Sequence, residues 1–589
     1  MAEKSSLSER LSIWTRLLSY LRRGKAELFY LIVLSLLLGT LQLAAPLLLG
    51  RILDSMLPGS QMNFKLLGLL ALCYAGSFFL GLLQGREVAK VSFRTAGRLR
   101  EDAFSHLTKL PTAFFDRARH GDIINRLTTD VQLVSEALQQ IFTQLFSGLV
   151  ILLGSLIFMF RLNSGIAFLV LLLTPLSFFI TGIIARSSHR LFMDQSQLTA
   201  DLQSHAEEML DGQKLIRAYA AEGKSAEIFR ARNQELYETG QKAQFASSLT
   251  NPGTRFVNNI TYVCVGVFAS ALAAQGRLSI GDISRDGFKS FTLYNRPKVF
   301  AKFAKPVNEI TAVMTQVQQG LASAERIFLL LDEDAEPDES DKASLQLKEG
   351  AVRFDQVSFS YVKDKPLIQD FSLSIEAGQT VAIVGPTGAG KTTLVNLLMR
   401  FYECDKGAIY MDGQDIYECR RSSVRGAYGM VLQDTWLFGG TIFDNIAFGK
   451  EGASEEEVIA AAKAARAHHF IMQMPQGYQT KLQDAGKSLS AGQKQLLTIA
   501  RVMLSEPALL ILDEATSDID TRTEILVQES FLRLMEGRTS FIIAHRLSTI
   551  RQADLILVMD KGQVIETGSH EELLEAGGFY ADLYQSQFA

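Results

Sequence analysis

The residue types needed to bind phosphate groups occur together in a glycine-rich segment that follows the apolar run Val381–Val384. The segment fits the pattern G-x-x-x-x-G-K-[ST] and consists of Gly385, Pro386, Thr387, Gly388, Ala389, Gly390, Lys391, Thr392 and Thr393. In this pattern glycines let backbone N–H groups turn toward phosphate oxygens, the lysine reaches the outer phosphates, and the threonine hydroxyl can ligate magnesium. A helix beginning at Lys391 would also point its positive end at the anion. Strand, loop and helix thus follow in the order that an ATP–Mg²⁺ site requires.

Two carboxylates, Asp513 and Glu514, follow the apolar run 508–512, which is typical of a fully buried strand. Asp513 would hold the magnesium ion that Thr392 also contacts, and Glu514 would polarise the attacking water. Magnesium neutralises charge that builds on the phosphoryl oxygens, so catalysis would consist mainly of positioning and electrostatics. We therefore expect ATP hydrolysis without a covalent nucleophile.

The elements that must position these groups begin near residue 350. Alternating runs at 352–354, 357–359 and 371–375 predict strands, and strands followed by helices around a phosphate loop predict an α/β nucleotide fold. An acidic run with a proline, 331–338, is typical of a solvated linker. We therefore expect a first domain at 1–330, a linker at 331–349 and an ATPase domain at 350–589.

The composition of the chain indicates a second kind of domain. Hydrophobic residues make up 47% of the 589 residues, the mean hydropathy is +0.12, and the apolar excess lies in the first half. The formal net charge of -4 gives no argument for nucleic-acid binding. The four cysteines lie far apart without C-x-x-C spacing, so neither a zinc site nor a disulfide framework is expected.

The first domain is expected to be an all-α membrane domain with six spans. Apolar stretches near 26–50, 63–84, 141–160 and 164–185 reach the about 20 residues that a helix needs to cross a bilayer, and 256–274 is a fifth candidate. A sixth crossing within 278–312 is required to return the chain to the compartment that holds ATP. Its charges cannot all face lipid, so it is either restricted to about 288–304 beside a watery cavity or irregular and supported by neighbouring helices.

Basic residues before the first span and after the second predict a multi-pass protein of a cell membrane, with the N-terminus and the ATPase domain in the cytoplasm. Spans two to five then continue into long cytoplasmic helical arms. The pattern of Leu202, Ala206, Met209 and Leu210 marks one face of such a helix.

A family resemblance rests on an ordered set of motifs. The segment Leu489-Ser490-Ala491-Gly492-Gln493-Lys494-Gln495-Leu496 precedes the strand and carboxylates at 509–514, and Ser517-Asp518-Ile519-Asp520 and His545 follow them. This set resembles an ATP-binding cassette (ABC) domain, and together with six spans the chain resembles an ABC exporter half-transporter of the multidrug and lipid type. The resemblance covers nearly the whole chain.

The resemblance implies roles for further residues. Tyr361 is similar to the aromatic residue that stacks on adenine, Gln433 to the glutamine that senses magnesium and the attacking water, and His545 to the histidine at the γ-phosphate. Ser490 can cap the helix that follows it, and the N–H groups around Ser490, Gly492 and Gln493 would form a second anion site. In the family this site binds the γ-phosphate held by a partner cassette, so two cassettes enclose two ATP molecules.

The partner and the substrate stay open at this point. Ala491 stands where the family usually has glycine, and Asp518-Ile519 is similar to the form found in the catalytically complete subunit of heterodimeric exporters. Both a homodimer and a heterodimer with a second half-transporter therefore remain possible, with membrane lipid as the surroundings. We expect ATP-driven export of an amphipathic, drug-like or lipid-like small molecule. The alternative is a cassette-gated channel or regulatory membrane protein that does not pump.

The same resemblance suggests which segments would transmit motion from the cassettes to the membrane domain. Residues 120–127 and 212–218 lie midway through the two cytoplasmic arms and are similar to the short helices that dock on the cassettes. Closure of the cassettes on ATP would then move the arms as levers.

Overall fold

The computed structural model describes residues 7–588 except for 23, 55–63, 163, most of 250–315, 363–364, 433–434, 483–485, 487, 514–519 and 545–546. The chain divides into two compact units. We call Met1–Thr108 with His120–Glu333 the helical unit, and Lys109–Arg119 with Asp334–Ala589 the α/β unit. The short segment 109–119 thus belongs to the α/β unit, although helical-unit residues surround it in sequence.

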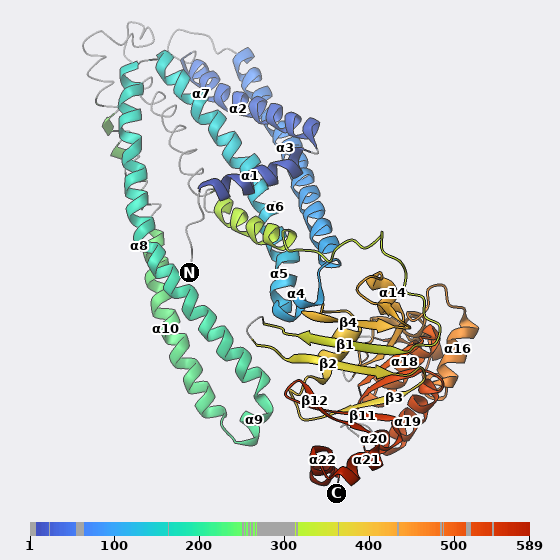
Figure 1. Cartoon of the computed structure of the whole chain (residues 1–589). Helices are drawn as coiled ribbons and strands as arrows, with labels where there is room; N and C mark the ends of the chain where they lie inside the picture. Colours follow the sequence, from blue (N-terminus) through green and yellow to red (C-terminus); the bar gives the residue numbers. More distant parts are fainter. Residues whose placement is uncertain are drawn as a thin grey trace. The chain divides into compact units, whose positions relative to one another are not determined.

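The helical unit consists of long helices and a few short ones in the part that the structure describes (Figure 1). They are α1 (Leu7–Arg22), α2 (Lys25–Asp54), α3 (Phe64–Leu107), α5 (His120–Asn125), α6 (Val131–Gln140), α7 (Phe146–Leu162), α8 (Ser164–Asp211), α9 (Gln213–Ala218) and α10 (Glu222–Ser248). Two π-helical turns, Arg126–Asp130 and Ile141–Leu145, join α5, α6 and α7. A further helical stretch covers residues 316–331.

Three helical stretches among the described residues are long and apolar enough to cross a membrane: Lys25–Ala45, Phe64–Leu107 and His120–Gly154. The apolar half of α3 exposes Leu72 (68%), Phe78 (62%) and Phe79 (64%), a surface that suits lipid rather than water. The four apolar stretches expected between 26 and 185 all lie in helices. The predicted fifth span and the predicted sixth span, 256–274 and 278–312, lie largely outside the described residues.

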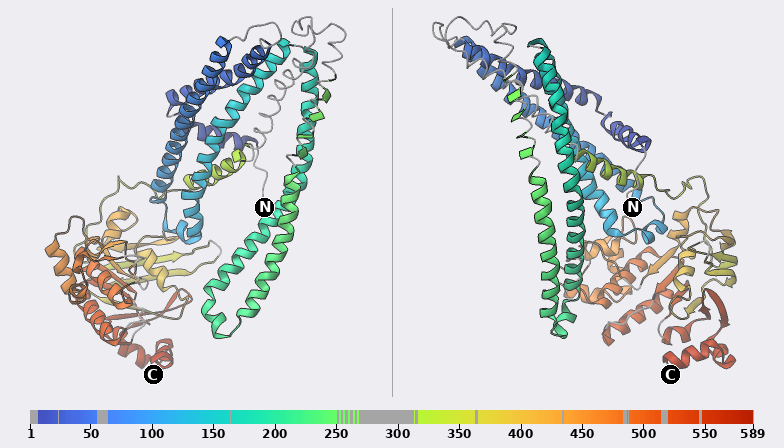
Figure 2. Two further views of the ribbon diagram at one scale, coloured as in Figure 1. Left: turned by 180° about the vertical axis from the view of Figure 1, so that it is seen from behind. Right: turned by 90° about the vertical axis from the view of Figure 1, so that its left-hand side faces the viewer.

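The predicted cytoplasmic arms are helical. Helices α8 and α10 pack against each other along their length, and α9 lies at the turn between them, as the two views of Figure 2 also show. The expected docking segment 212–218 therefore forms a separate short helix at the tip of a helical hairpin. Its contact with a cassette stays a prediction.

The α/β unit is built on two main sheets. The six-stranded sheet has the order β12-β11-β3-β10-β9-β6, and all its neighbouring strands are parallel except β12. The four-stranded antiparallel sheet has the order β2-β1-β4-β5. The bounds are β1 (Val352–Phe359), β2 (Ile368–Ile375), β3 (Thr380–Val384), β4 (Lys406–Met411), β5 (Gln414–Asp415), β6 (Tyr428–Val431), β9 (Leu509–Asp513), β10 (Thr539–Ile543), β11 (Leu555–Asp560) and β12 (Gln563–Gly568). The predicted strands and the α/β fold are confirmed.

Helices and short elements complete this unit in the described residues. They are α4 (Thr112–Arg117), α13 (Lys391–Leu398), α14 (Arg421–Gly426), β7 (Gly440–Thr441), α15 (Ile442–Ala447), α16 (Glu455–Ala464), α17 (His468–Gln473), the 3-10 turn Gly477–Gln479, β8 (Lys481–Leu482), α18 (Ala491–Ser505), α19 (Thr521–Met535), α20 (Leu547–Gln552), α21 (His570–Ala576) and α22 (Phe579–Phe588). Alternate residues of β3 pack on opposite faces of the sheet: Ala382 and Val384 join one buried cluster, and Val381 and Ile383 join the other.

Residues 334–349, which the sequence assigns to a solvated linker, are held on the α/β unit by ion pairs. Glu339 lies 2.7 Å from the guanidinium of Arg400, a side chain that is only 2% exposed, and 3.0 Å from that of Arg421. Glu336 makes a further ion pair with Arg425 at 2.7 Å. Within the acidic run, Glu336 pairs with Arg425, and Glu339, which follows the run, pairs with Arg400 and Arg421, so this part of the expected solvated linker is held by ion pairs.

The carboxylate of Asp412 holds the end of the segment 334–349 and gives a first testable prediction. The carboxylate of Asp412 accepts backbone N–H bonds from residues 348–351 at 2.6–3.1 Å. Burial alone would raise the pKa of Asp412, but these hydrogen bonds outweigh burial and hold the pKa below its usual value of 3.8. We expect Asp412→Ala to lower the free energy of unfolding of the α/β unit by about 2–4 kcal/mol, because four amides lose a charged acceptor.

Urea unfolding of the purified full-length chain, with amide hydrogen exchange of residues 348–351, measures this effect. Asp370→Ala is the matched control, because Asp370 is exposed and has the same positive φ (51° against 46° for Asp412). A depressed pKa contributes stability above pH 3.8 that is lost as the pH falls through the folded-state pKa. The difference in free energy of unfolding between wild type and Asp412→Ala should therefore shrink as the pH falls through that acidic range. A difference that does not depend on pH would contradict the role of the charge.

Candidate nucleotide site

The predicted phosphate loop lies at the carboxyl edge of the parallel strands. It follows β3, and the register places Ile543 of β10 beside both Ile383 of β3 and Asp513 of β9. In open α/β sheets, ligands bind outside the carboxyl ends of the strands. The fold therefore brings the loop and Asp513 to one edge, although they are far apart in sequence.

The backbone of the loop requires glycine at the two fixed glycine positions of the motif, Gly385 and Gly390, and also at Gly388. Gly388 and Gly390 have φ angles of 83° and 100°, where a side chain causes strain. Gly385 has φ 152°, and a Cβ there would approach the carbonyl oxygen of Met559 to 2.2 Å. Gly390 is the N-cap of α13, so the loop turns directly into the positive end of this helix.

The ammonium group of Lys391 lies inside the curve of the loop. Its Nζ donates hydrogen bonds to the carbonyl oxygens of Gly385 at 2.7 Å and Pro386 at 3.1 Å. Burial lowers the pKa of Lys391, and the nearby Asp513 carboxylate acts in the opposite direction. A cation in a partly desolvated loop is well placed to bind a polyanion.

Two side chains whose oxygen atoms suit magnesium, those of Thr392 and Asp513, lie near the ammonium group of Lys391. Thr392 is exposed in the first turn of α13, and Asp513 ends β9 at the same edge of the sheet. Hydroxyl and carboxylate oxygens are hard donors of the kind that Mg²⁺ prefers beside phosphate. The residues present therefore fit the magnesium ion that an ATP site needs.

Tyr361 lies beside the phosphate loop helix. Its hydroxyl donates to Thr393 Oγ1 at 3.3 Å and accepts from Asn396 Nδ2 at 3.1 Å, and its side chain is 38% exposed. An anchored, partly exposed aromatic ring offers a flat face to a base. Sequence reasoning named Tyr361 but missed Asn396, whose position one turn along the predicted helix from Thr392 and Thr393 was the available signal.

Three predicted residues, Gln433, Glu514 and His545, lie outside the described residues. The strands before them are β6, β9 and β10, which are neighbours in the sheet and end at the same edge as β3. Their roles remain predictions from sequence and strand order.

The second anion site has the local geometry that the sequence predicts. Ser490 caps α18: its hydroxyl accepts from the N–H of Gln493 at 3.3 Å, and Gln493 Oε1 accepts from the N–H of Ser490 at 3.1 Å. Gly492 is buried in the first turn. This capping box fixes a helix N-terminus whose remaining N–H groups can bind an anion.

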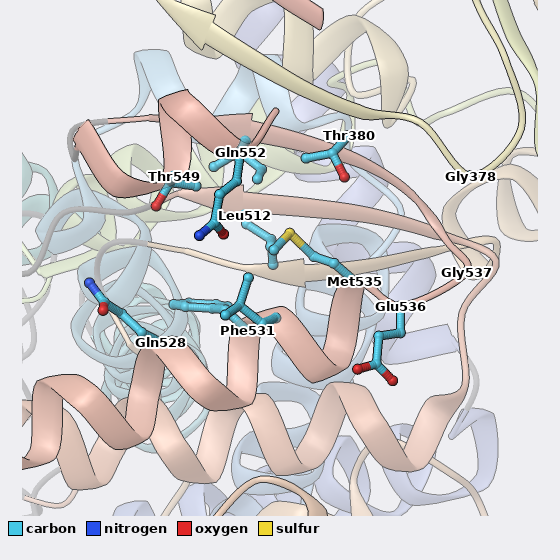
Figure 3. Close-up of a pocket in the computed structure, with 12 residues that line it drawn as sticks. Gly378, Thr380, Leu512, Gln528, Phe531, Met535, Glu536, Gly537, Thr549 and Gln552 are labelled. Atoms are coloured by element: carbon cyan, nitrogen blue, oxygen red, sulfur yellow. The ribbon is translucent and has the colours of Figure 1, made fainter. Parts of the chain in front are cut away.

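A separate cavity of about 330 Å³ lies between α19, α20 and the sheet (Figure 3). Leu512, Phe531 and Met535 form its apolar wall, and Gln528 and Gln552 supply polar groups. None of the phosphate loop residues lines it, so the nucleotide site is defined by the loop and not by this cavity.

Comparisons with known proteins agree with this geometry. A family model for the ABC transporter transmembrane region matches residues 28–286, and the ABC transporter model matches residues 368–517. The chain is 41% identical over 532 residues to the fatty acid ABC transporter ATP-binding/permease protein of Mycobacterium bovis, covering 89% of this chain and 82% of that protein. It is 39% identical over 577 residues to the uncharacterized ABC transporter ATP-binding protein YfiC of Bacillus subtilis, covering 97% and 94%.

A solved structure extends the similarity to the fold. The structure of a bacterial Atm1-family ABC exporter with ATP bound has a TM-score of 0.78 and 30% sequence identity, covering 96% of this chain and 99% of that chain. The long apolar helices of the helical unit then belong to the membrane domain, and the two sheets of the α/β unit belong to the cytoplasmic ATPase domain. With both domains in one polypeptide and an ATPase that drives transport, the chain belongs to the ABC exporters, of which it is a half-transporter.

Proposed function

We propose that this chain exports an amphipathic, drug-like or lipid-like molecule across the cell membrane by alternating access, as one of two half-transporters. The observation that carries the proposal is the fusion of long apolar helices to an ATPase unit that has both a phosphate loop and a capped signature helix. The mycobacterial relative is named for fatty acids, which supports including fatty acids in the substrate class that we propose.

We further propose the following roles at the ATP site. Lys391 and the loop N–H groups bind the phosphates, Tyr361 stacks on adenine, and Thr392, Asp513 and Gln433 hold the Mg²⁺ ion. Bound magnesium supplies charge neutralisation on the phosphoryl oxygens. Glu514 takes the proton of the attacking water, and His545 contacts the γ-phosphate.

The export proposal is tested in proteoliposomes that contain the purified chain and a fluorescent long-chain fatty acid. With ATP and Mg²⁺ added outside the vesicles, we expect the fatty acid to accumulate inside them, and we expect no accumulation when either is left out. ATP hydrolysis should be faster when fatty acid is present. Flux down the gradient with a non-hydrolysable ATP analogue, without accumulation, would instead support a gated channel and contradict the proposal.

Assembly is a separate prediction. The sequence contains one phosphate loop and one signature segment, and the anion site at Ser490 needs a γ-phosphate from a second cassette. We expect the active particle in lipid to contain two chains of 65.2 kDa or one such chain and a related half-transporter.

Mass measurement and ATPase assay of the chain expressed alone distinguish the two cases. An active two-chain particle shows a homodimer, and an inactive chain that a second half-transporter restores shows a heterodimer. Full ATPase activity in a particle with a single chain would contradict the requirement for two cassettes.

A further inference from the structure

The cavity between α19, α20 and the sheet has the size of a small-molecule site (Figure 3). Its volume is about 330 Å³, at the lower end of the range of roughly 300–1,000 Å³ that ligand pockets span. This volume is roughly twice that of an engineered cavity that binds benzene. A molecule built on two fused rings therefore fits the space.

The floor of the cavity is apolar and already packed. Leu512, Phe531 and Ile542 are only 2%, 5% and 1% exposed, so their side chains are held in place by the core on their other sides. In Figure 3 the side chain of Met535 extends toward Leu512. Methionine thioethers adapt to the shape of a neighbour and make favourable contacts with aromatic rings. This floor suits the flat face of an aromatic ligand.

One end of the cavity is polar. Gln528 of α19 and Gln552 of α20 lie at the same end in Figure 3, and neither amide forms a side-chain hydrogen bond within the described part of the chain. Each primary amide has both donors and an acceptor. The two side chains together can therefore bind one uncharged polar group, such as an amide, in a ligand whose rings lie on the floor.

The charge of the lining excludes anionic ligands. No lysine, arginine or histidine is among the described residues that line the cavity, and the one acidic residue among them, Glu536, is exposed at the end opposite the two glutamines. A carboxylate that entered would lose its water without gaining a cation, which is costly. The site therefore favours an uncharged molecule, which sets it apart from a fatty acid carboxylate.

The walls of the cavity belong to the elements that carry the expected catalytic groups. Strand β9 contributes Leu512 and leads through residues 514–520, which include Glu514, into α19. Strand β10 contributes Ile542 and leads through residues 544–546, which include His545, into α20. The phosphate loop contributes no residue to the lining. A ligand here would touch both pairs of elements without touching the residues that bind phosphate.

We propose that this cavity is a regulatory site for an uncharged aromatic amphipathic molecule of about two rings, and that its occupancy slows ATP hydrolysis without weakening ATP binding. The proposal rests on the proposed roles of Glu514 and His545. An occupant that contacts α19, α20 and the sheet stabilises one separation of these elements. The two connections between them then adjust less readily to the attacking water and the γ-phosphate.

Naphthamide and naphthoate are the probes, because they have the same shape and differ in charge. The full-length chain, with its partner half-transporter if one is required, is placed in lipid with ATP, Mg²⁺ and either probe. Amide hydrogen exchange in peptides that cover 521–537 and 547–552 reports occupancy, and steady-state hydrolysis gives kcat and KM. We expect naphthamide to slow exchange and to lower kcat by about three-fold or more each, with KM for ATP within about two-fold. Naphthoate should have neither effect.

Two variants at one position test the location and the charge of the site. Gln528→Trp fills the polar end and should lose both responses to naphthamide. Gln528→Lys adds a cation at the same place and should gain the responses to naphthoate. Gln563→Trp is the matched control, because Gln563 is an exposed glutamine of β12 that does not line the cavity. It should respond to naphthamide as wild type does.

Unchanged exchange of the wild type with naphthamide would overturn the site, as would a full response in Gln528→Trp. Slower exchange with unchanged kcat would overturn the regulatory role, and an equal response of the wild type to naphthoate would overturn the ligand class. A wild type that does not hydrolyse ATP would refute the proposed function, whereas exchange in 521–537 and 547–552 would still report whether the cavity binds the probe.

Discussion

Replacing Glu514 with Gln is expected to lower kcat for ATP hydrolysis by roughly 10²–10⁴-fold while ATP binding is retained. The amide has the shape of the carboxylate but cannot accept the proton of the attacking water. Asp513, Thr392 and Lys391 are untouched by this change, so the magnesium and phosphate contacts that we propose for them should persist. The variant should therefore accumulate with ATP enclosed between two cassettes.

Hydrolysis by the purified chain in lipid, together with retention of radiolabelled ATP after rapid gel filtration, measures both parts of this prediction. Glu571→Gln is the control, because Glu571 is an exposed residue at the start of α21. Near-normal turnover in Glu514→Gln would show that Glu514 is not the base and would direct attention to His545. Loss of ATP binding in the same variant would mean that Glu514 is needed to bind ATP rather than to activate the attacking water.

The parts of the site that the sequence predicted are those that local rules determine. The phosphate loop needs glycine because of its φ angles, the strand before Asp513 is apolar because both faces of the sheet are covered, and Ser490 is a helix cap because Gln493 follows three residues later. Each of these features depends on residues close together in the chain. Their recognition therefore required no knowledge of tertiary contacts.

The parts that the sequence did not predict depend on contacts between distant residues. Residues 109–119 group with the α/β unit, whereas 120–127, the expected first docking segment, group with the helical unit, and docking of 120–127 on a cassette stays a prediction. The hydroxyl of Tyr402 donates a hydrogen bond to Asp116, 286 residues away in the chain, and nothing near either residue marks the pairing. Likewise, the acidic run at 331–338 has the composition of a solvated linker, and only the fold brings Arg425 to Glu336 and Arg400 and Arg421 to the adjacent Glu339.

Replacing Lys391 with Ala is expected to abolish most ATP binding. The ammonium group is the cation of the phosphate loop, and charge-assisted hydrogen bonds contribute about 1.5–3 kcal/mol each, so loss of one or two of them weakens ATP binding by roughly 10–10⁴-fold. Hydrolysis at fixed ATP should fall at least as much. Equilibrium binding of labelled ATP and a titration of KM measure the loss, and Lys406→Ala, which removes an exposed lysine of β4, is the control.

The pH dependence of binding distinguishes a lost charge from a damaged loop. Because burial lowers the pKa of Lys391 in the protein and a bound phosphate favours the charged form, ATP binding at alkaline pH must take up a proton. Wild-type affinity should therefore decline as the pH rises toward the usual lysine value of 10.5, and this decline should be absent from Lys391→Ala. An equal decline in both proteins would assign the effect to another group. Unchanged affinity in Lys391→Ala at neutral pH would show that the loop N–H groups and magnesium bind the phosphates without this cation.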